Sequence, residues 1–397
     1  MNYLVISPFY PENFQPFTIE LAKKEGVTVL GIGQEPYDQL PEELRNALTE
    51  YFRVENLENL DEVKRAAAFL IYKHGPMDRV ESHNEHWLET DAALREQFNI
   101  FGAKPSNLKK TKFKSEMKKY FTKAGVPVVP GMVVKTEKDI EKAVKKIGFP
   151  LIAKPDNGVG ASGTFKLTKK ADLEDFKTAW DGRTAYFFEK FVNSSIITTY
   201  DGLIDNKGNV VFETGLTYVH TPFELVQSKK DNAYYIEKEL DPKLVSYGRA
   251  IIKAFGMKER FFHIEFFKDG KDYIAIEYNN RMAGGFTVES YNYAHSIDLF
   301  RDYANVVSGG SVEERRFEPQ YCLVATRRDA TDYVHSADAI RDHYADKLKT
   351  VKRMPDAFAE LQGNDAYLLV TKSKDELDEM IAFIGETKGS LSTVVGR

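Results

Sequence analysis

Residues 260–281, RFFHIEFFKDGKDYIAIEYNNR, constrain the fold of this 397-residue chain more than any other segment. Apolar residues lie on both sides of KDGK, a turn sequence, which predicts two antiparallel strands joined by a tight hairpin. Glu265 and Glu277 are 12 positions apart with the turn midway, so the hairpin brings their carboxylates together. Because side chains alternate with a period of two, Glu277, Asn279 and Arg281 share one face of the second strand.

Two interpretations of this face remain open. In the first, Glu265, Glu277 and Asn279 supply hard oxygen ligands for Mg²⁺ or Mn²⁺, which takes its other ligands from phosphates and water. Arg281 then clamps a carboxylate or a phosphoryl group. In the second, the hairpin is exposed and its charges are solvated. The strands look covered rather than exposed, and an unpaired carboxylate is costly in such surroundings. Their apolar residues are Phe262, Ile264, Phe266, Ile274, Ile276 and Tyr278.

A glycine-rich segment, KPDNGVGASGTFKL, occupies residues 154–167. Its glycines have the G-x-G-x-x-G spacing that also occurs in dinucleotide-binding turns: Gly158, Gly160 and Gly163. Such a turn needs a helix directly after it, but Phe165 and Leu167 alternate with polar residues as in a strand. The segment therefore predicts a hairpin whose tip could cover phosphates with backbone N–H groups. Asn-Gly is also an ordinary hairpin-turn signal, so a purely structural turn stays open.

The first hundred residues alternate predicted strands and helices, and this rhythm predicts a small open parallel sheet. Single helices are expected over residues 108–123 and 289–307. Most of the five lysines between positions 109 and 118 are expected to form a solvated face.

Composition excludes several classes of protein. A net charge of -5 gives no global basic field, so nucleic-acid binding is not expected. The single cysteine, Cys322, excludes an internal disulfide and a cysteine-based zinc site. No apolar run approaches the length of a membrane span, and the first residues have no signal-peptide pattern. We therefore expect a cytoplasmic protein that does not bind membranes.

Taken in order, these motifs resemble the ATP-grasp superfamily, in the branch with biotin carboxylase, the carbamoyl phosphate synthetase large subunit and the L-amino acid ligases. The resemblance covers residues 1–310 and, more weakly, the remainder. It implies an α/β (α+β) ATP-grasp fold with an N-terminal Rossmann-like domain, a two-lobed ATP-grasp domain and a C-terminal α+β module. The implied boundaries are 1–105, 106–310 (lobes of about 125–192 and 193–310) and 311–397.

The resemblance also implies ATP and Mg²⁺ as cofactors and gives roles to individual residues. Lys114 and Lys154 would contact the ATP phosphates, although Phe113 stands where an acidic residue is usual before the first lysine. The mobile loop over the triphosphate would be Gly158, Gly160, Ser162 and Gly163. At the adenine hinge, Glu189 would face the amino group while the backbones of Lys190 and Val192 bond the ring. The metal ligands would be Glu265, Glu277 and Asn279, with Arg281 and Lys154 as catalytic residues.

The residues after Arg281 bear on the acid that would be activated. Bicarbonate-activating relatives carry a glutamate shortly after this arginine, but Met282-Ala283-Gly284-Gly285 follows it here. The pattern is similar to ligases that join amino acids, in which Gly284 and Gly285 would leave room for substrate. We therefore expect an ATP-dependent carboxylate–amine ligase that forms an amide through an acyl phosphate.

Further substrate contacts are less specific. Glu213 and His220 fall where related ligases contact the amine, but the favoured interpretation is a strand-edge glutamate and a loop histidine without a substrate contact. His263, which should share the face of Glu265, is a weaker candidate, as are Glu289 and His295.

Two alternatives remain: a bicarbonate-activating carboxylase or synthetase, and a non-catalytic ATP-binding module. The expected partners are small-molecule carboxylate and amine substrates, with a homodimer implied only at family level.

Overall fold

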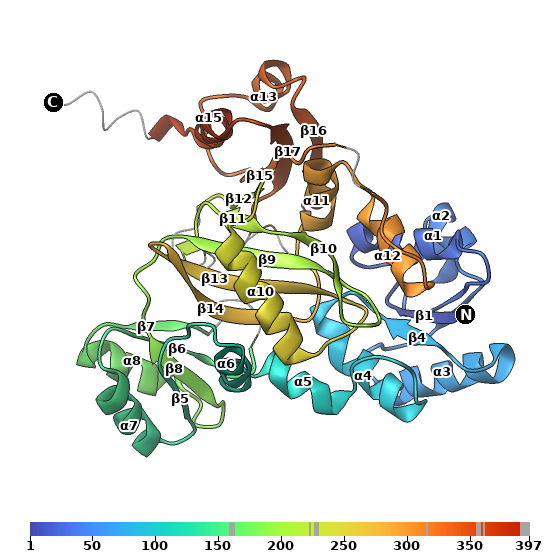
Figure 1. Ribbon diagram of the computed structural model, residues 1–397, viewed down its shortest axis with the longest axis horizontal. Coiled ribbons are helices and arrows are strands. Elements are labelled where there is room, and N and C mark those ends of the chain that lie inside the picture. Colours follow the sequence, from blue (N-terminus) through green and yellow to red (C-terminus); the bar gives the residue numbers. More distant parts are fainter. Residues whose placement is uncertain are drawn as a thin grey trace.

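The computed structural model describes residues 1–158, 163–221, 224–225, 230–314, 317–354, 359 and 362–389. Figure 1 shows a large central sheet with three groups of elements around it: the N-terminal elements at the lower right, a small lobe at the lower left and the C-terminal elements at the top.

The N-terminal elements form a parallel sheet of four strands in the order β3-β2-β1-β4. The strands are β1 (Asn2–Ile6), β2 (Thr28–Gly33), β3 (Glu50–Arg53) and β4 (Arg79–Glu81). The helices are α1 (Gln15–Ala22), α2 (Glu42–Ala47), α3 (Leu60–His74) and α4 (Leu88–Gln97). Buried side chains from β1, β2 and α3 share one core. The predicted open parallel sheet is confirmed.

The small lobe contains a second sheet of four strands, in the order β5-β8-β6-β7, covered by two helices. Its elements are β5 (Gly131–Val134), α7 (Glu137–Ile147), β6 (Leu151–Pro155), β7 (Phe165–Leu167), α8 (Lys170–Ala179) and β8 (Tyr186–Lys190). Strands β6 and β7 pair antiparallel on either side of the glycine-rich loop. A strand rather than a helix therefore follows the glycines, as the alternation of apolar residues predicted.

The central sheet has nine strands in the described part of the chain, in the order β14-β13-β9-β11-β12-β15-β17-β16, with β10 paired to β9. Its strands are β9 (Ile197–Ile204), β10 (Val210–Thr214), β11 (Leu216–Tyr218), β12 (Ala233–Ile236), β13 (Arg260–Asp269), β14 (Asp272–Asn279), β15 (Tyr321–Arg327), β16 (Leu348–Arg353) and β17 (Asp365–Thr371). Its helices are α10 (Pro242–Phe255), α11 (Thr287–His295), α12 (Leu299–Val307), α13 (Ala337–His343) and α15 (Lys374–Gly385). Because β15 pairs with β12, the C-terminal strands extend the same sheet.

The helix predicted over residues 108–123 is wrong as a single element. The segment forms α5 (Pro105–Lys112) and α6 (Lys114–Lys123), separated by Phe113 in an extended conformation. The break is stabilised by Asp156, next to the glycine-rich loop. Its carbonyl accepts the Lys114 N–H at 2.9 Å, and its carboxylate accepts the Ser115 N–H at 2.8 Å. A contact from a distant segment therefore caps α6 and replaces a continuous helix.

The helix predicted over residues 289–307 is also divided. Ser296 adopts a left-handed conformation with φ of 52°, which ends α11. Asp298 then caps α12 by accepting the backbone N–H of Arg301 at 3.1 Å. The cap side chain supplies an acceptor for an N–H that the helix itself leaves unpaired.

A buried ion-pair group joins the N-terminal sheet to the central sheet. Glu81, at the end of β4, lies 3.0 Å from Arg95 of α4 and 2.7 Å from Arg260 at the start of β13. Burial would raise the pKa of Glu81, but the two guanidinium groups hold it well below its usual range. The Glu81 carboxylate is thus a fixed charge between the N-terminal sheet and the central sheet. Its ion pairs bring the residues after β4 close to those that follow β14.

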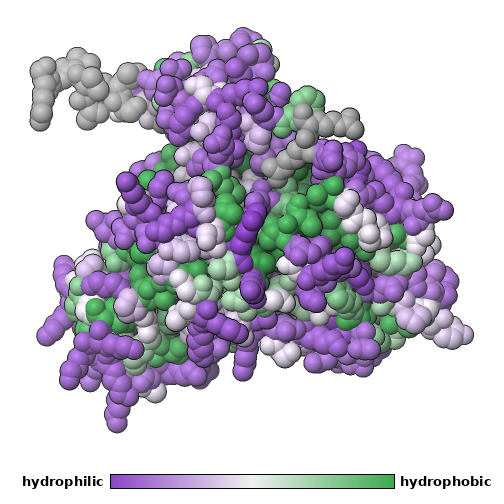
Figure 2. All heavy atoms as spheres, in the orientation of Figure 1, coloured by the Kyte–Doolittle hydropathy of each residue, from purple (hydrophilic) through white to green (hydrophobic). Residues whose placement is uncertain are grey.

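The apolar core also crosses between units, since side chains of α1 and β2 share one cluster with α11, α12 and β15. On the face of the molecule that Figure 2 shows, polar residues cover most of the rim and apolar residues gather near the middle. No helix in the described ranges is both long and apolar enough to cross a bilayer.

Candidate functional site

The β13–β14 hairpin places the two predicted acidic metal ligands directly opposite each other. Glu265 pairs with Glu277, and His263 pairs with Asn279, in an antiparallel register. A β-bulge follows the Glu265–Glu277 pair, so the alternation of side chains between the two faces of the sheet changes between this pair and the turn. The hairpin predicted from the sequence is confirmed, and so is the meeting of its two glutamates. Whether these side chains bind a metal stays a prediction.

A buried hydrogen-bonded group supports Glu265 from behind. His263 Nε2 lies 3.1 Å from Glu265 Oε1, and His263 Nδ1 lies 2.7 Å from Asp201 Oδ1. The Tyr291 hydroxyl donates to the second oxygen of Asp201 at 2.8 Å. Burial alone would lower the pKa of His263, but Asp201 and Glu265 raise it to about 9. The prediction that His263 shares the face of Glu265 is confirmed, whereas the sequence gave no signal for Asp201.

Lys114 connects the hairpin with the glycine-rich loop. Its ammonium donates to the carbonyl of Gly158 at 2.7 Å and lies 3.3 Å from Glu277 Oε1. The side chain is almost fully buried. A lysine predicted to contact phosphates therefore lies beside a predicted metal ligand, at the base of the loop.

Lys154 and Lys118 share one buried carboxylate, that of Glu189. Glu189 Oε1 lies 2.5 Å from Lys154 Nζ, and Oε2 lies 3.1 Å from Lys118 Nζ. Burial would raise the pKa of Glu189, but the two ammonium groups lower it to about 2. Burial and the neighbouring Lys154 lower the pKa of Lys118, while Glu189 opposes them. Most of the five lysines between positions 109 and 118 were expected on a solvated face, but Lys114 and Lys118 are buried. The sequence did not distinguish Lys118 from the neighbouring lysines.

The adenine-hinge residues lie at the end of β8. The Glu189 carboxylate is already ion-paired with two lysines, and the backbone N–H of Lys190 donates to Pro130 at 3.0 Å. Val192 follows shortly after the strand. Their contacts with adenine stay a prediction.

Two of the four predicted loop residues are described. Gly163 has a φ of +68°, a left-handed conformation that favours glycine, and Gly158 supplies the carbonyl to Lys114. Gly160 and Ser162 lie outside the described residues.

The chemistry of the hairpin residues fits magnesium. Mg²⁺ commonly binds one or two carboxylates and completes its shell with phosphate and water oxygens, and Glu265, Glu277 and Asn279 offer such a set. Among the described residues, no group of three or more His, Cys, Asp or Glu side chains is arranged to hold a metal ion. A site here would therefore depend on nucleotide phosphates for further ligands.

Arg281 lies in a separate cavity of about 700 Å³, named here the Arg281 cavity. It is lined by Pro11, Glu12, Asn13, Phe14, Gln15, Pro16, His83, Asn84, Glu85, Arg281, Met282, Gly284, Gly285, Phe286, Glu289, Phe300, Lys352, Arg353, Met354 and Gln362. The guanidinium is fixed by Glu85, whose Oε2 lies 2.7 Å from Arg281 Nε, and by the carbonyl of Met282. Residues from the N-terminal elements, the segment after β14 and the C-terminal strand β16 thus surround one space.

Gly284 and Gly285 both line this cavity, and that they leave room for substrate stays a prediction. A methyl group added at Gly284 would meet no atom of the described residues within 4 Å. Gly285 has a φ of +67°, and its carbonyl accepts from the Asn13 side chain at 2.8 Å. Glu289 also lines the cavity, and its carboxylate lies 3.2 Å from Lys352 Nζ.

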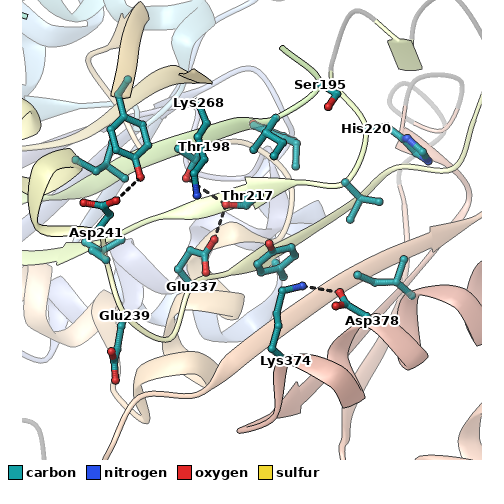
Figure 3. Close-up of a pocket in the computed structure, with 18 of the residues that line it drawn as sticks. Ser195, Thr198, Thr217, His220, Glu237, Glu239, Asp241, Lys268, Lys374 and Asp378 are labelled. Carbon is teal, nitrogen blue, oxygen red and sulfur yellow. Dashed lines mark hydrogen bonds and ion pairs between the residues drawn. The ribbon is translucent and has the colours of Figure 1, made fainter. Parts of the chain in front are cut away.

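His220 lies in a different cavity, of about 690 Å³, which Figure 3 shows with Thr217, Glu237 and Lys268 around it. Thr198 lines this cavity, whereas its neighbour Thr199 pairs with Glu265. Because side chains alternate along a strand, the cavity lies on the opposite face of β9 from the predicted metal ligands.

The remaining two candidates make contacts elsewhere. Glu213 accepts from the Tyr200 hydroxyl at 2.6 Å and pairs with Arg249 of α10 at 2.7 Å. The His295 ring lies 2.8 Å from the Thr214 hydroxyl in a buried position. Neither Glu213 nor His295 is among the described residues that line the two cavities.

Comparison with known proteins adds family information. Residues 110–314 match the family described as the carbamoyl-phosphate synthase L chain, ATP binding domain. An L-arginine-specific L-amino acid ligase of Bacillus subtilis is 27% identical over 182 residues, 46% of this chain and 43% of the relative. An arginine-specific carbamoyl phosphate synthase large chain of Halalkalibacterium halodurans is 26% identical over 214 residues, 50% of this chain.

The chain matches less than half the length of these two curated relatives, 43% of the first and 20% of the second. A crystal structure of an L-amino acid ligase from Bacillus licheniformis aligns with a TM-score of 0.72 and 17% identity. That alignment covers 96% of this chain and 95% of the other. At this identity the likeness shows the shared fold, and it extends over the C-terminal strands.

Proposed function

The chain belongs to the ATP-grasp enzymes of the carbamoyl-phosphate synthase L chain ATP-binding family, and from this premise we propose that it is an ATP-dependent carboxylate–amine ligase. The observation that supports this most is the position of Lys114, whose ammonium lies 3.3 Å from Glu277 and 2.7 Å from the carbonyl of Gly158. One side chain thereby connects the glutamate pair with the base of the glycine-rich loop. ATP phosphates bound there would meet cationic and hard oxygen groups together.

The proposed reaction has two steps. A carboxylate oxygen of the acid attacks the γ-phosphorus of ATP, the bond from that phosphorus to the bridging oxygen breaks, and ADP leaves. The resulting acyl phosphate can expel phosphate, whereas a free carboxylate would have to expel oxide. An uncharged amine then attacks the carbonyl carbon, the bond to the phosphate oxygen breaks, and the amine proton is released. The products are an amide, ADP and phosphate.

Two anions must approach each other in the first step, so neutralisation of charge is the main task of the site. Lys114 and Lys154 would face the phosphates, and Arg281 would orient the acceptor carboxylate. Glu265, Glu277 and Asn279 would hold Mg²⁺, which would neutralise negative charge on the phosphates. The loop between β6 and β7 would exclude water from the acyl phosphate.

The acceptor acid is proposed to be an amino acid rather than bicarbonate. Gly284 and Gly285 lie in the segment where bicarbonate-activating relatives carry a glutamate, and the open space at Gly284 in the Arg281 cavity would suit a larger acid. The names of two relatives, both L-amino acid ligases, agree with this choice.

ADP release measured with and without a pool of amino acids tests the proposal. A ligase should release ADP only when a carboxylate and an amine are present, and mass spectrometry should detect a condensed product. Turnover that requires only bicarbonate would favour a carboxylase or synthetase. Tight ATP binding without turnover under any of these conditions would indicate a non-catalytic module instead.

A further inference from the structure

Glu289 has an unusual environment in the Arg281 cavity. Its side chain is 13% exposed, and Lys352 Nζ lies 3.2 Å from one of its carboxylate oxygens. The other oxygen is buried and has no hydrogen bond to another residue in the described part of the chain. A buried acceptor without a donor costs free energy, so rotation of this carboxylate toward a ligand in the cavity that donates N–H groups would be favourable.

Lys352 does not fully compensate the charge of Glu289. Its side chain is 38% exposed, and its ammonium also lies 5.3 Å from the centre of the Phe286 ring. Burial raises the pKa of Glu289, and Lys352 offsets only part of that rise. A second cation beside the free oxygen would therefore stabilise the ionised carboxylate.

Two other acids line the cavity: Glu12, which is exposed, and Glu85, which is already committed. Glu85 binds Arg281 Nε at 2.7 Å and so fixes the guanidinium that would orient the acceptor carboxylate. His83, also buried in the cavity wall, has a ring Nε2 without a hydrogen-bond partner among the described residues. Burial lowers the pKa of His83 to about 4, so its ring is neutral near pH 7 and adds no cation.

The rest of the wall is largely apolar. Side chains from three parts of the chain supply it: Phe14, Met282, Phe286, Phe300 and Met354. Apart from the exposed residues Glu12 and Arg353, charge is therefore concentrated in two pairs, Arg281 with Glu85 and Lys352 with Glu289. The apolar part of the wall suits a hydrocarbon group.

Resting on the function proposed above, we propose that Glu289 binds the ammonium group of an α-amino acid whose carboxylate faces Arg281 and whose apolar side chain contacts the aromatic wall. Glu289 is then a specificity-determining residue. Lys352, supplied by the C-terminal strand β16, keeps Glu289 oriented before substrate arrives. An acid of the same shape without the amino group would leave the Glu289 oxygen unpaired, and sites built to bind a polar group reject such analogues strongly.

The test compares matched acids in a hydroxamate assay, in which hydroxylamine traps the activated acid in the presence of ATP and Mg²⁺. The pairs are leucine with 4-methylpentanoate, and phenylalanine with 3-phenylpropanoate. Wild-type protein should prefer at least one amino acid over its partner by roughly 100-fold or more in kcat/KM. Glu289→Gln should reduce this preference to about tenfold or less, through a higher KM for the amino acid, because an amide does not attract ammonium as a carboxylate does.

Two variants separate this role from a structural one. Glu85→Gln should slow activation of both acids of a pair, because it releases Arg281, and should leave the preference between them. If Glu289→Gln does not fold, Glu289→Asp replaces it as the test, because it moves the carboxylate back by the length of one methylene group. It should raise the KM of the amino acid only.

The inference is overturned if Glu289→Gln weakens both acids equally, if wild-type protein does not distinguish the pairs, or if Glu85→Gln removes the preference. If no acid is activated, calorimetry of the full chain with ADP and Mg²⁺ becomes the test. Wild-type protein should then still bind the amino acid more tightly than the matched acid without the amino group. If Glu289→Gln abolishes this difference in affinity, the role of Glu289 is supported although the ligase function fails. Equal binding of both acids would overturn the role of Glu289.

Discussion

Two largely buried glutamates, Glu189 at the proposed phosphate end and Glu289 in the Arg281 cavity, have opposite electrostatic environments. Each oxygen of Glu189 faces an ammonium, at 2.5 Å and 3.1 Å, and the pKa of this carboxyl falls to about 2. Glu289 has one half-exposed lysine, and burial raises its pKa. Burial acts in the same direction on both, so the number of cations decides the outcome.

This difference shows that the two ends of the site are prepared in different ways. At the phosphate end, protein carboxylates already neutralise the lysines, so the charged side chains are held in position before nucleotide arrives. In the Arg281 cavity Glu289 is paired with one partly exposed lysine, so the ligand itself would complete the electrostatics. Preorganised charge suits a ligand common to the whole family, whereas an incomplete pair suits selection between substrates.

Removing Glu277 should have the largest effect. Glu277→Ala deletes a proposed metal ligand and the partner of Lys114, and should lower ATP turnover by at least roughly 1,000-fold. ADP release measures the activity, and circular dichroism confirms the fold. Glu213→Ala is a suitable control, because Glu213 pairs with Arg249 away from both cavities. Near-normal turnover of Glu277→Ala would show that Glu277 is not needed for ATP turnover, and the proposed phosphate end would then have no functional role to compare.

Lys118→Met tests whether both cations on Glu189 are needed. With one ammonium gone, Glu189 would hold Lys154 more strongly and compete with the phosphates for it. Turnover should fall on the order of 100-fold, mainly through a higher KM for ATP. Lys119→Met, one position along α6 and exposed, is the matched control. Equal behaviour of the two variants would mean that Lys118 only fills space.

Gly284→Leu tests the other end by filling open space, since a Cβ at this position would meet no atom of the described residues within 4 Å. A leucine there should lower kcat/KM for large acids on the order of 30-fold, the effect of about 2 kcal/mol of lost fit. Small acids such as alanine should be affected less, and ATP binding, measured by calorimetry, should not change. A uniform loss for all acids would show that the segment after Arg281 was disturbed rather than the cavity.

The sequence revealed the phosphate end because its residues lie in local motifs. The glutamate spacing, the turn and the strand alternation needed no knowledge of distant contacts, and they predicted the register of Glu265 and Glu277. Lys118 was missed because a buried lysine and a solvated one look alike in a lysine-rich helix. The break at Phe113 was missed for a related reason, since its cap comes from Asp156 of another segment.

The Arg281 cavity could be predicted only in part. Arg281 and the two glycines were recognised, but Glu85 and Lys352 come from segments far away in the sequence. Lys352 lies on β16, LKTVKR, in which three basic residues among six gave no clear sign of a strand. The short strands β5 and β12 were missed as well, because their identity depends on pairing with neighbours.

The smallest effect expected is a difference in how stability depends on pH. The folded-state pKa of Glu189 lies below its unfolded value, so its contribution is complete above pH 4.5 and is lost as pH falls toward about 2. For Glu289 the folded-state pKa is raised, so its contribution is complete below the unfolded value and is lost as pH rises through the folded value. Each group changes the free energy of unfolding by at most about 1.4 kcal/mol per pH unit.

Urea unfolding between pH 3 and 6, on wild-type protein and two glutamine variants, separates the two signs. Compared with wild type, Glu189→Gln should lose part of the fall in stability on acidification. Glu289→Gln should lose part of the fall on going from acid toward neutral pH. Glu58→Gln, at an exposed position, should leave the pH profile nearly unchanged. If both buried variants change the profile in the same direction, the two carboxylates are equally compensated, and Glu289 has no unmet charge to offer a substrate.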